Sequence, residues 1–277
     1  MTPDQYCQER AAASGSSFYY SFLFLEPLRR QAITALYAFC REVDDAVDEC
    51  PDSAVARTKL AWWRSEVQAL YEGRASHPVT QALAVTLKHF YLPQEQLLEI
   101  IDGMEMDLDQ VRYADFKALH LYCYRVASVV GLLAAEIFGY SDRQTLKYAH
   151  DLGLAFQLTN IIRDVGEDAR RGRIYLPQDE MARFEVSNDD LLQANYSDKF
   201  RRLMAFQVER AQALYSQAFA QLPVADRKAQ RAGLIMAAIY RATLDEIVRD
   251  SFRVLDQRIS LPPLRKLWLA GKTWWLA

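Results

Sequence analysis

The chain has 277 residues, of which 51% are hydrophobic and 25% are charged, and its formal net charge is −3. The apolar half is enough for a substantial core, and the length allows one large domain or two small ones. The near-neutral charge balance gives no electrostatic reason to expect nucleic acid as a partner.

The four cysteines form neither a CxxC pair nor a metal-ligand spacing, and the polar amino terminus is unlike a secretory signal. We therefore expect a reduced, cytoplasmic protein. No apolar run approaches the roughly 20 residues that span a bilayer, so any membrane contact is expected at the surface.

Helix-start signals recur along the chain. Pro27, Pro93 and Pro177 suit first-turn positions, where the missing N–H of proline costs nothing. Ser141–Gln144 has the spacing of a capping box, and Ser187–Asp190 is a related acidic start. With the helical periodicity, these signals predict helices over 28–49, 53–72, 78–90, 94–112, 115–138, 142–165, 197–221 and 225–255.

The segment 142–165 is apolar around much of its circumference, as a central, buried helix should be. No sustained alternation of apolar and polar residues bounded by turn signals predicts a strand. No linker rich in Pro, Gly or Ser divides the chain. We therefore predict one all-α domain over residues 1–277.

Polar stripes run along two of the predicted helices. Their members, at helical spacing, are Tyr37, Arg41, Asp44 and Asp48 on the first and Gln157, Asn160, Asp164 and Asp168 on the second. Carboxylates one turn apart destabilise an isolated helix by roughly 0.2–0.5 kcal/mol, so we expect the fold to supply a countercharge. Mg²⁺ takes oxygen ligands and bridges carboxylates to substrate phosphates. Two facing stripes would hold a diphosphate; the alternative is that each is a solvated helix face.

Three arginines follow the second stripe. Arg170, Arg171 and Arg173 surround a glycine, and they could close over phosphate oxygens. The alternative is that they neutralise the neighbouring acids. Of the three, Arg173 is the stronger candidate for binding substrate.

Tyr122 lies near the start of an apolar helical segment. A tyrosine on a cavity wall can orient a proton or stabilise a cation through its ring face, although core packing is the more usual role.

A third acidic cluster precedes Arg112. It comprises Asp102, Glu105, Asp107 and Asp109, and its spacing is less regular than that of the two stripes. We expect a solvated helix face paired with Arg112.

Longer motifs around the stripes resemble a known family. Ala35–Arg41 runs into the first aspartate pair, and Gln157–Asp164 runs on towards Gly172–Pro177. Over nearly its whole length the chain resembles the squalene and phytoene synthases, which join prenyl diphosphates head to head. Within that family, the Ser16–Phe24 and Gly103–Asp107 segments most resemble the presqualene diphosphate synthases of bacterial hopanoid pathways.

The resemblance implies an isoprenoid-synthase helical bundle around a central apolar cavity. At matching positions it implies Mg²⁺ ligands, and these are Asp44, Asp48, Asn160, Asp164 and Asp168. It makes Tyr122 the catalytic tyrosine, acting with the four aspartates. The implied diphosphate contacts are Ser16, Ser17, Tyr37, Arg41, Gln157, Tyr240 and Arg258, to which the residue pattern adds Arg173.

The implied reaction condenses two farnesyl diphosphates to presqualene diphosphate, with release of diphosphate, for squalene or hopanoid biosynthesis. Phytoene synthases usually carry Glu where this chain has Asp45. We expect Mg²⁺ but not NADPH, and enzymes of downstream isoprenoid chemistry stay open as partners. Phytoene, dehydrosqualene and NADPH-dependent squalene formation are alternatives. So is a non-catalytic assembly protein, but a scaffold has no reason to keep both aspartate pairs.

Tryptophans and cations are interspersed in the carboxy-terminal segment 264–277. They are Trp268, Trp274 and Trp275 with Arg265, Lys266 and Lys272. This composition is typical of an interfacial segment, which would place the protein peripherally on the inner face of the membrane. The equally open alternative is that the tryptophans cap the helical core or a dimer interface.

Overall fold

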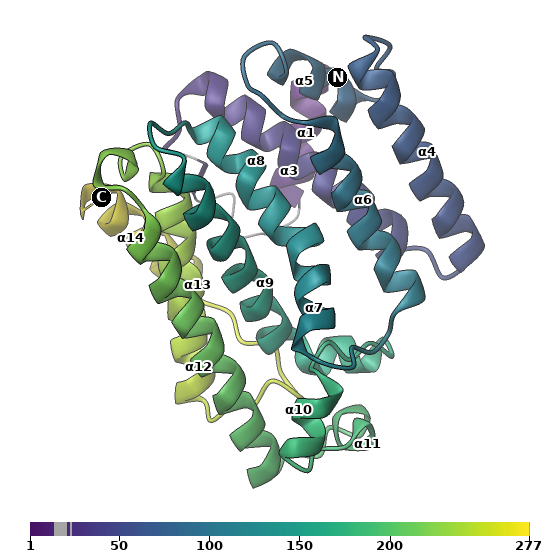
Figure 1. Ribbon diagram of the computed structural model, residues 1–277, viewed down its shortest axis with the longest axis vertical. Helices are drawn as coiled ribbons and strands as arrows, with labels where there is room; N and C mark the ends of the chain where they lie inside the picture. Colours follow the sequence, from purple (N-terminus) through teal and green to yellow (C-terminus); the bar gives the residue numbers. More distant parts are fainter. Residues whose placement is uncertain (14–20, 23, 277) are drawn as a thin grey trace.

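The computed structural model describes residues 1–13, 21, 22 and 24–276 (Figure 1). One isolated parallel β-bridge pairs Arg112 with Ile174. The regular elements of the described part are helices. They are α1 (Pro3–Ala13), α3 (Pro27–Asp48), α4 (Ser53–Tyr71), α5 (Pro78–Thr86), α6 (Gln94–Asp109), α7 (Phe116–Cys123), the π-helix η1 (Tyr124–Ser128), α8 (Val129–Phe138), α9 (Gln144–Arg170), α10 (Gln178–Arg183), α11 (Asn188–Leu192), α12 (Asp198–Gln221), the 3₁₀ turn η2 (Val224–Asp226), α13 (Arg231–Arg249) and α14 (Pro263–Leu276). The predicted all-α fold is confirmed.

Helix α9 is the centre of the bundle, as its apolar circumference predicted. It packs against α12 on one side and against η1 and α8 on the other (Figure 1). Two glycines allow this close approach. A Cβ at Gly131 would lie 2.4 Å from the Ala149 carbonyl oxygen, and one at Gly153 would lie 2.5 Å from that of Ala127. The helices therefore meet at backbone distance.

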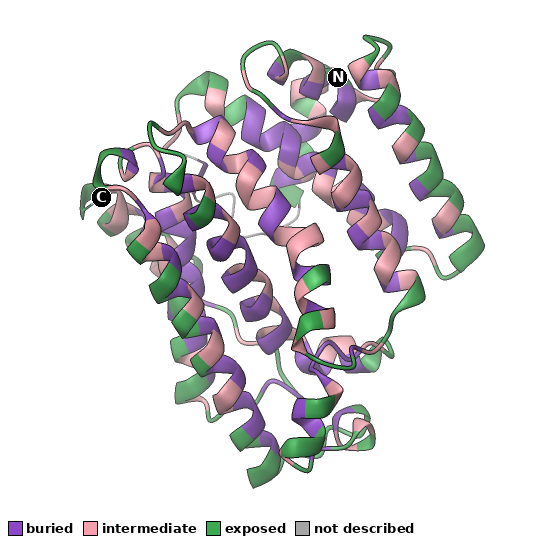
Figure 2. Cartoon of the chain, viewed as in Figure 1, coloured by how far each residue is buried: buried purple, intermediate pink, exposed green. Residues whose placement is uncertain are grey.

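Two apolar clusters form the core (Figure 2). One surrounds α9, α12 and α13, with Tyr215 and Phe200 fully buried. The other surrounds α3, α4 and α6, with Leu36 and Phe39 fully buried. Helices α3 and α9 thus each anchor one cluster, and their polar stripes are held by rigid elements.

The helix from Phe116 to Phe138 is continuous through α7, η1 and α8. By length and composition it could cross a membrane, which the sequence analysis did not expect of any segment. Half of its most apolar window is buried inside the fold, and core helices pass the same test. Within the bundle, η1 packs against α6 and α9.

The helix ends follow most of the start signals. Pro27 opens α3, whereas Pro93 and Pro177 stand one residue before α6 and α10. The capping box of Ser187 and Asp190 is present at α11. The segment predicted over 225–255 is α-helical only over Arg231–Arg249, with the 3₁₀ turn η2 before it, and the backbone turns left-handed soon after α13.

The capping box predicted at Ser141 is wrong. Helix α9 begins at Gln144, and its N-cap residue is Arg143, whose side chain makes no capping hydrogen bond. The Gln144 amide donates to the Asp142 carboxylate over 2.8 Å, and Ser141 does not cap the helix. Instead, the Ser141 amide and hydroxyl donate to Asp226 over 2.7 Å and 2.6 Å, and the Thr145 hydroxyl donates to it over 2.6 Å. These hydrogen bonds outweigh burial and lower the pKa of Asp226 to about 2. A distant carboxylate therefore fixes the turn between α8 and α9.

Candidate active site

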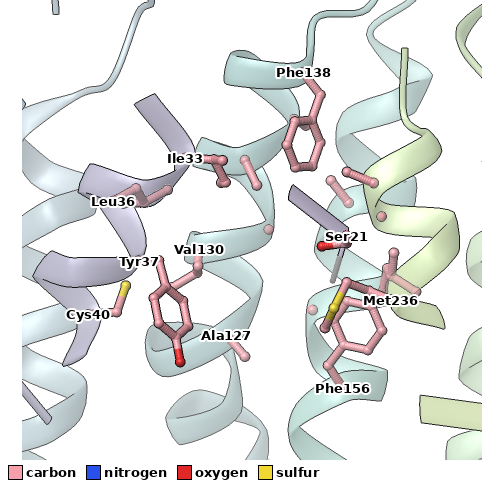
Figure 3. A pocket seen from close by; sticks show the side chains of 18 of the residues that line it. Ser21, Ile33, Leu36, Tyr37, Cys40, Ala127, Val130, Phe138, Phe156 and Met236 are labelled. Carbon is pink, nitrogen blue, oxygen red and sulfur yellow. The ribbon is translucent and has the colours of Figure 1, made fainter. Parts of the chain in front are cut away.

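A cavity of about 200 Å³ lies between α3, α8, α9 and α13. Its wall is mostly apolar and includes Val130, Phe138 and Met236 (Figure 3). No carboxylate and no cation lines it among the described residues. Tyr37 from α3 and Asn160 from α9 are polar members of the wall, each one or two turns before the aspartates of its helix. The predicted apolar cavity is present, and the aspartate motifs lie beyond its polar part.

The ends of α3 and α9 face each other across an arginine pair. Asp48, at the end of α3, accepts from Arg173 over 2.5 Å and from Arg171 over 3.0 Å, and both arginines follow α9. The structure therefore brings the two motifs together, as the facing stripes required. Arg170 points elsewhere and donates to the Leu255 carbonyl over 3.0 Å.

Asp44 lies beside Asp48 on α3 and pairs with Arg41 over 2.6 Å. The same guanidinium also binds Asp45 over 2.5 Å, and Arg10 of α1 binds Asp45 from the other side. Burial, together with the charge of Asp48, raises the pKa of Asp44 to about 7 despite Arg41. Arg41 therefore does not offset the burial of Asp44 and its repulsion by Asp48.

The second motif is unevenly compensated. Asp164 is held by Arg163 over 2.5 Å and by Arg258 over 2.9 Å, and these guanidiniums overcome burial and lower its pKa. Asp168, one turn later, lies near Arg173 but forms no ion pair with any described residue. Burial and the charges of Asp164 and Asp107 raise the pKa of Asp168 to about 8. A cation between the motifs would stabilise its ionised form.

The donor set fits Mg²⁺. The candidate ligands are carboxylate and amide oxygens, which hard divalent cations prefer. The Asn160 side-chain oxygen is buried and has no hydrogen-bond partner in the described part of the chain, while its amide nitrogen donates to Gln157 over 3.3 Å. Among the described residues no three acidic, His or Cys side chains already converge on one point. Three of the four motif aspartates instead bind arginines, so these pairs would have to loosen as a cation enters.

Tyr122 is buried beneath the motifs and does not line the cavity. Its hydroxyl donates to Asp107 over 3.0 Å. The Tyr175 hydroxyl donates to the other oxygen of the same carboxylate over 2.7 Å, and the two rings stack 5.1 Å apart. Tyr122 is thus part of a polar cluster that the sequence did not reveal.

The prediction for the third acidic cluster is wrong in two respects. Asp107 is only 7% exposed and is not part of a solvated face. The exposed members of the cluster bind α4 rather than Arg112: Asp109 pairs with Arg57, and Asp102 pairs with Arg64. Arg112 donates to the backbone carbonyl of Gly172. Asp107 is two residues from Glu105 and from Asp109, which is about 200° around the helix, so it lies on the opposite face of α6.

The other candidate residues divide into three groups. Gln157 lines the cavity with Tyr37, and Tyr240 is buried against the Phe156 ring, 4.9 Å away. Arg258 is exposed at the second motif. Ser16 and Ser17 lie outside the described residues.

Lys266, which the sequence places only in the interfacial segment, lies at the edge of the candidate site. Burial and the charges of Arg163 and Arg258 lower its pKa, so Lys266 lies close to the two arginines that bind Asp164. A lysine isolated from any aspartate motif gives no signal in the sequence.

A family model for squalene/phytoene synthase matches residues 11–265. A phytoene synthase of Arthrospira platensis is 36% identical over 274 residues, covering 94% of this chain and 89% of the relative. The chain spans 63% of the length of two longer plant relatives.

Two solved structures share the fold. A dehydrosqualene synthase in complex with a ligand has a TM-score of 0.86 and 29% identity, covering 98% of this chain and 95% of that one. The squalene synthase HpnC of Alicyclobacillus acidocaldarius has a TM-score of 0.80 and 29% identity, covering 90% and 94%. The chain therefore belongs to the squalene/phytoene synthase family, whose shared reaction is the head-to-head condensation of prenyl diphosphates.

The loop that carries Arg258 is docked on α9 at a glycine. The Gly166 amide donates to the Val254 carbonyl over 3.1 Å. A Cβ at Gly166 would lie 2.2 Å from the Leu255 carbonyl oxygen, which is backbone and cannot swing aside. Gly166 therefore permits the contact that places Arg258 at Asp164.

We expect Gly166→Ala to displace this loop and to destabilise the fold by about 1–3 kcal/mol, the usual cost of overpacking. Urea denaturation measures the change. Gly271→Ala is the matched control, because no atom lies within 4 Å of its added Cβ. Gly271 lies within α14, so alanine should leave stability unchanged or raise it by up to about 1 kcal/mol. Equal stability of the Gly166 variant and the wild type would contradict the close approach.

Proposed function

We propose that this protein condenses two farnesyl diphosphates to presqualene diphosphate in a Mg²⁺-dependent reaction. The observation that carries the proposal is the pair of facing aspartate motifs beyond the polar part of an apolar cavity. A prenyl diphosphate has the same division, with an apolar chain at one end and a polyanion at the other. Membership of the family supplies the class of reaction.

The apolar wall accounts for the hydrocarbon part of the substrate. Val130, Phe138 and Met236 offer no nucleophile and no charge to an allylic cation (Figure 3). Water excluded by such a wall cannot capture the cation before the second prenyl chain reaches it. The glycines that bring α8 against α9 keep this wall closed on one side.

The arginines account for the diphosphate. Arg41, Arg173 and Arg163 hold motif carboxylates now, and each guanidinium can turn its remaining donors to phosphate oxygens. Bound Mg²⁺ would be held by Asp44, Asp48, Asn160, Asp164 and Asp168, and would supply Lewis-acid polarisation of the leaving diphosphate.

In the proposed reaction the C–O bond of one farnesyl diphosphate breaks, and the diphosphate leaves with the electron pair. The double bond of the second farnesyl chain attacks the resulting allylic cation. Loss of a proton then closes a cyclopropane ring, and the second diphosphate is retained. The arginines stabilise the departing charge, which develops only as the bond breaks.

Farnesyl diphosphate is proposed as the substrate because Asp45 and the Gly103–Asp107 segment resemble presqualene diphosphate synthases. The two structural neighbours carry the names of a dehydrosqualene and a squalene synthase, which agrees with a farnesyl substrate. The second candidate is phytoene formation from geranylgeranyl diphosphate, which the name of the Arthrospira relative favours.

Metal dependence gives the first functional test. Asp44→Asn, Asp48→Asn, Asp164→Asn or Asp168→Asn should each slow turnover at least about a hundredfold, which corresponds to about 2.7 kcal/mol of transition-state stabilisation. Diphosphate release measured with Mg²⁺ and with EDTA reports the effect. Asp245→Asn, at an exposed position on α13, is the control and should retain full activity. Full activity in EDTA, or in two of the four motif variants, would contradict the assignment.

Product identity gives the second test. Purified protein is incubated with labelled farnesyl or geranylgeranyl diphosphate, each with and without NADPH, and the products are identified. We expect presqualene diphosphate from farnesyl diphosphate whether or not NADPH is present. Squalene appearing only with NADPH would show that the enzyme completes both half-reactions, and phytoene from the longer substrate would favour the second candidate.

We also propose that α14 attaches the protein peripherally to an anionic membrane surface. The tryptophans of this helix divide between two roles. Trp274 stacks on Phe24 with ring centroids 5.2 Å apart, and the Arg231 guanidinium lies over the Trp274 ring at 4.7 Å, so Trp274 caps the core. Trp268 and Trp275 are 60% and 88% exposed. The helix sequence contains three cations and no acid. Arg265 pairs with Glu246 of α13, whereas Lys272 lies over the ring of the exposed Trp268 at 5.0 Å, where a cation complements anionic lipid.

Flotation with vesicles tests this attachment. The double variant Trp268→Ser/Trp275→Ser should bind vesicles containing anionic lipid at least about tenfold more weakly than the wild type, because burying each large apolar side chain contributes about 1.5–3 kcal/mol. Trp62→Ser, at a half-exposed tryptophan on α4, is the control and should bind as the wild type does. If the wild type does not float, or if the double variant floats equally well, α14 is not a membrane anchor.

A further inference from the structure

The buried carboxylate of Asp107 accepts hydrogen bonds from two tyrosines near the aspartate motifs. Asp107 is 7% exposed, and Tyr122 and Tyr175 are also buried. Each carboxylate oxygen accepts one hydroxyl: Oδ2 accepts from Tyr122 over 3.0 Å, and Oδ1 accepts from Tyr175 over 2.7 Å. The two hydroxyl oxygens are 3.5 Å apart. One residue on α6 therefore fixes side chains from α7 and from the segment that follows α9.

We propose that Asp107 is a positioning residue, which sets the direction of the Tyr122 and Tyr175 hydroxyl protons in the proposed condensation. This inference rests on the proposed function. An ionised carboxylate can only accept hydrogen bonds, so both hydroxyl protons must point towards it. The lone pairs of Tyr122 and Tyr175 are then directed away from Asp107. Both tyrosines are presented as acceptors, and neither can donate its proton to a diphosphate.

The cluster lies where the charges of both motifs converge. Asp107 lies in the electrostatic field of Asp48 from α3 and of Arg173 from the segment after α9, and it adds to the fields at Asp44 and Asp168. A void of about 10 Å³ is bordered by Tyr175, Asp168 and Arg173. The tyrosine hydroxyls are therefore next to the second motif rather than in a remote part of the core.

Burial and the neighbouring groups determine which side chains of this cluster carry a proton. Burial raises the pKa of Asp107 to about 6, while Arg173 and the two tyrosine hydroxyls act in the opposite sense and favour the carboxylate. Burial and the negative charge of Asp107 also raise the pKa of Tyr122 well above its usual value. Tyr122 thus stays a neutral phenol whose oxygen can face a cation, and it can accept a proton only as its own proton passes to Asp107.

The test is a double-mutant cycle between Asp107→Asn and Tyr122→Phe. Asparagine keeps the shape of Asp107 but replaces one acceptor by a donor, so one hydroxyl must turn. We expect Asp107→Asn to lower kcat about a hundredfold, within the range for groups that orient proton transfer, and to change KM by less than about threefold. In the Tyr122→Phe background the same change should cost less than about tenfold, since one of the two hydroxyls that Asp107 positions is gone and only that of Tyr175 remains.

Asp109→Asn is the matched control, because Asp109 is on the same helix, is exposed and pairs with Arg57. It should retain turnover within about twofold. The same cycle is measured on the free energy of unfolding by urea, which reads the coupling of Asp107 to Tyr122 without any substrate. We expect the loss of stability from Asp107→Asn to fall by at least half in the Tyr122→Phe background.

The possible results distinguish a failure of the Asp107–Tyr122 coupling from a failure of the proposed function. Independent, additive effects on stability would overturn the coupling, whether or not the enzyme turns over. Coupled stability with unchanged kcat in Asp107→Asn would overturn the positioning role and leave a purely structural one. A wild type that converts neither farnesyl nor geranylgeranyl diphosphate would overturn the proposed function, while the cycle on unfolding would still decide the coupling.

Discussion

Crowded negative charge beyond the polar part of the cavity is the constraint on which the rest of the structure depends. Asp44, Asp48, Asp164 and Asp168 come from two helices whose ends face each other, and Asp107 adds a fifth charge beneath them. Two like charges about 4 Å apart repel by about 4 kcal/mol at an effective dielectric constant of about 20. This is comparable with the whole stability of many domains, about 5–15 kcal/mol. The fold therefore has to compensate these charges.

Arginines compensate the negative charge of the aspartates, but only in part. Arg41 and Arg173 bind carboxylates of the first motif, and Arg163 and Arg258 bind Asp164 of the second, whereas Asp168 has no ion pair among the described residues. The surrounding helices bring the arginines and the motif aspartates together. Close glycine contacts join α8 to α9 and dock the loop of Arg258, so cations distant in sequence reach the carboxylates. The arginines leave part of the negative charge of the aspartates uncompensated. A divalent cation, bound together with a diphosphate, would compensate it.

Local patterns predicted the fold and the two motifs but not their surroundings. Helical spacing is a property of one segment, so the stripes ending at Asp48 and Asp168 were readable from the sequence alone. Burial depends on what another segment places opposite. Asp107 differs from its exposed neighbours only by helical phase, and Ser141 binds a carboxylate far along the chain instead of capping its own helix. No local pattern carries either fact.

The central claim is that the facing carboxylates, now held by arginines, form the binding site for a metal–diphosphate group. A crystal structure of the full chain with Mg²⁺ and inorganic diphosphate tests this most directly. The account predicts cations bound by Asp44, Asp48, Asp164 and Asp168, with Arg173 turned from Asp48 to the diphosphate. Diphosphate bound elsewhere, or ordered density for Mg²⁺ that none of these aspartates contacts, would contradict it.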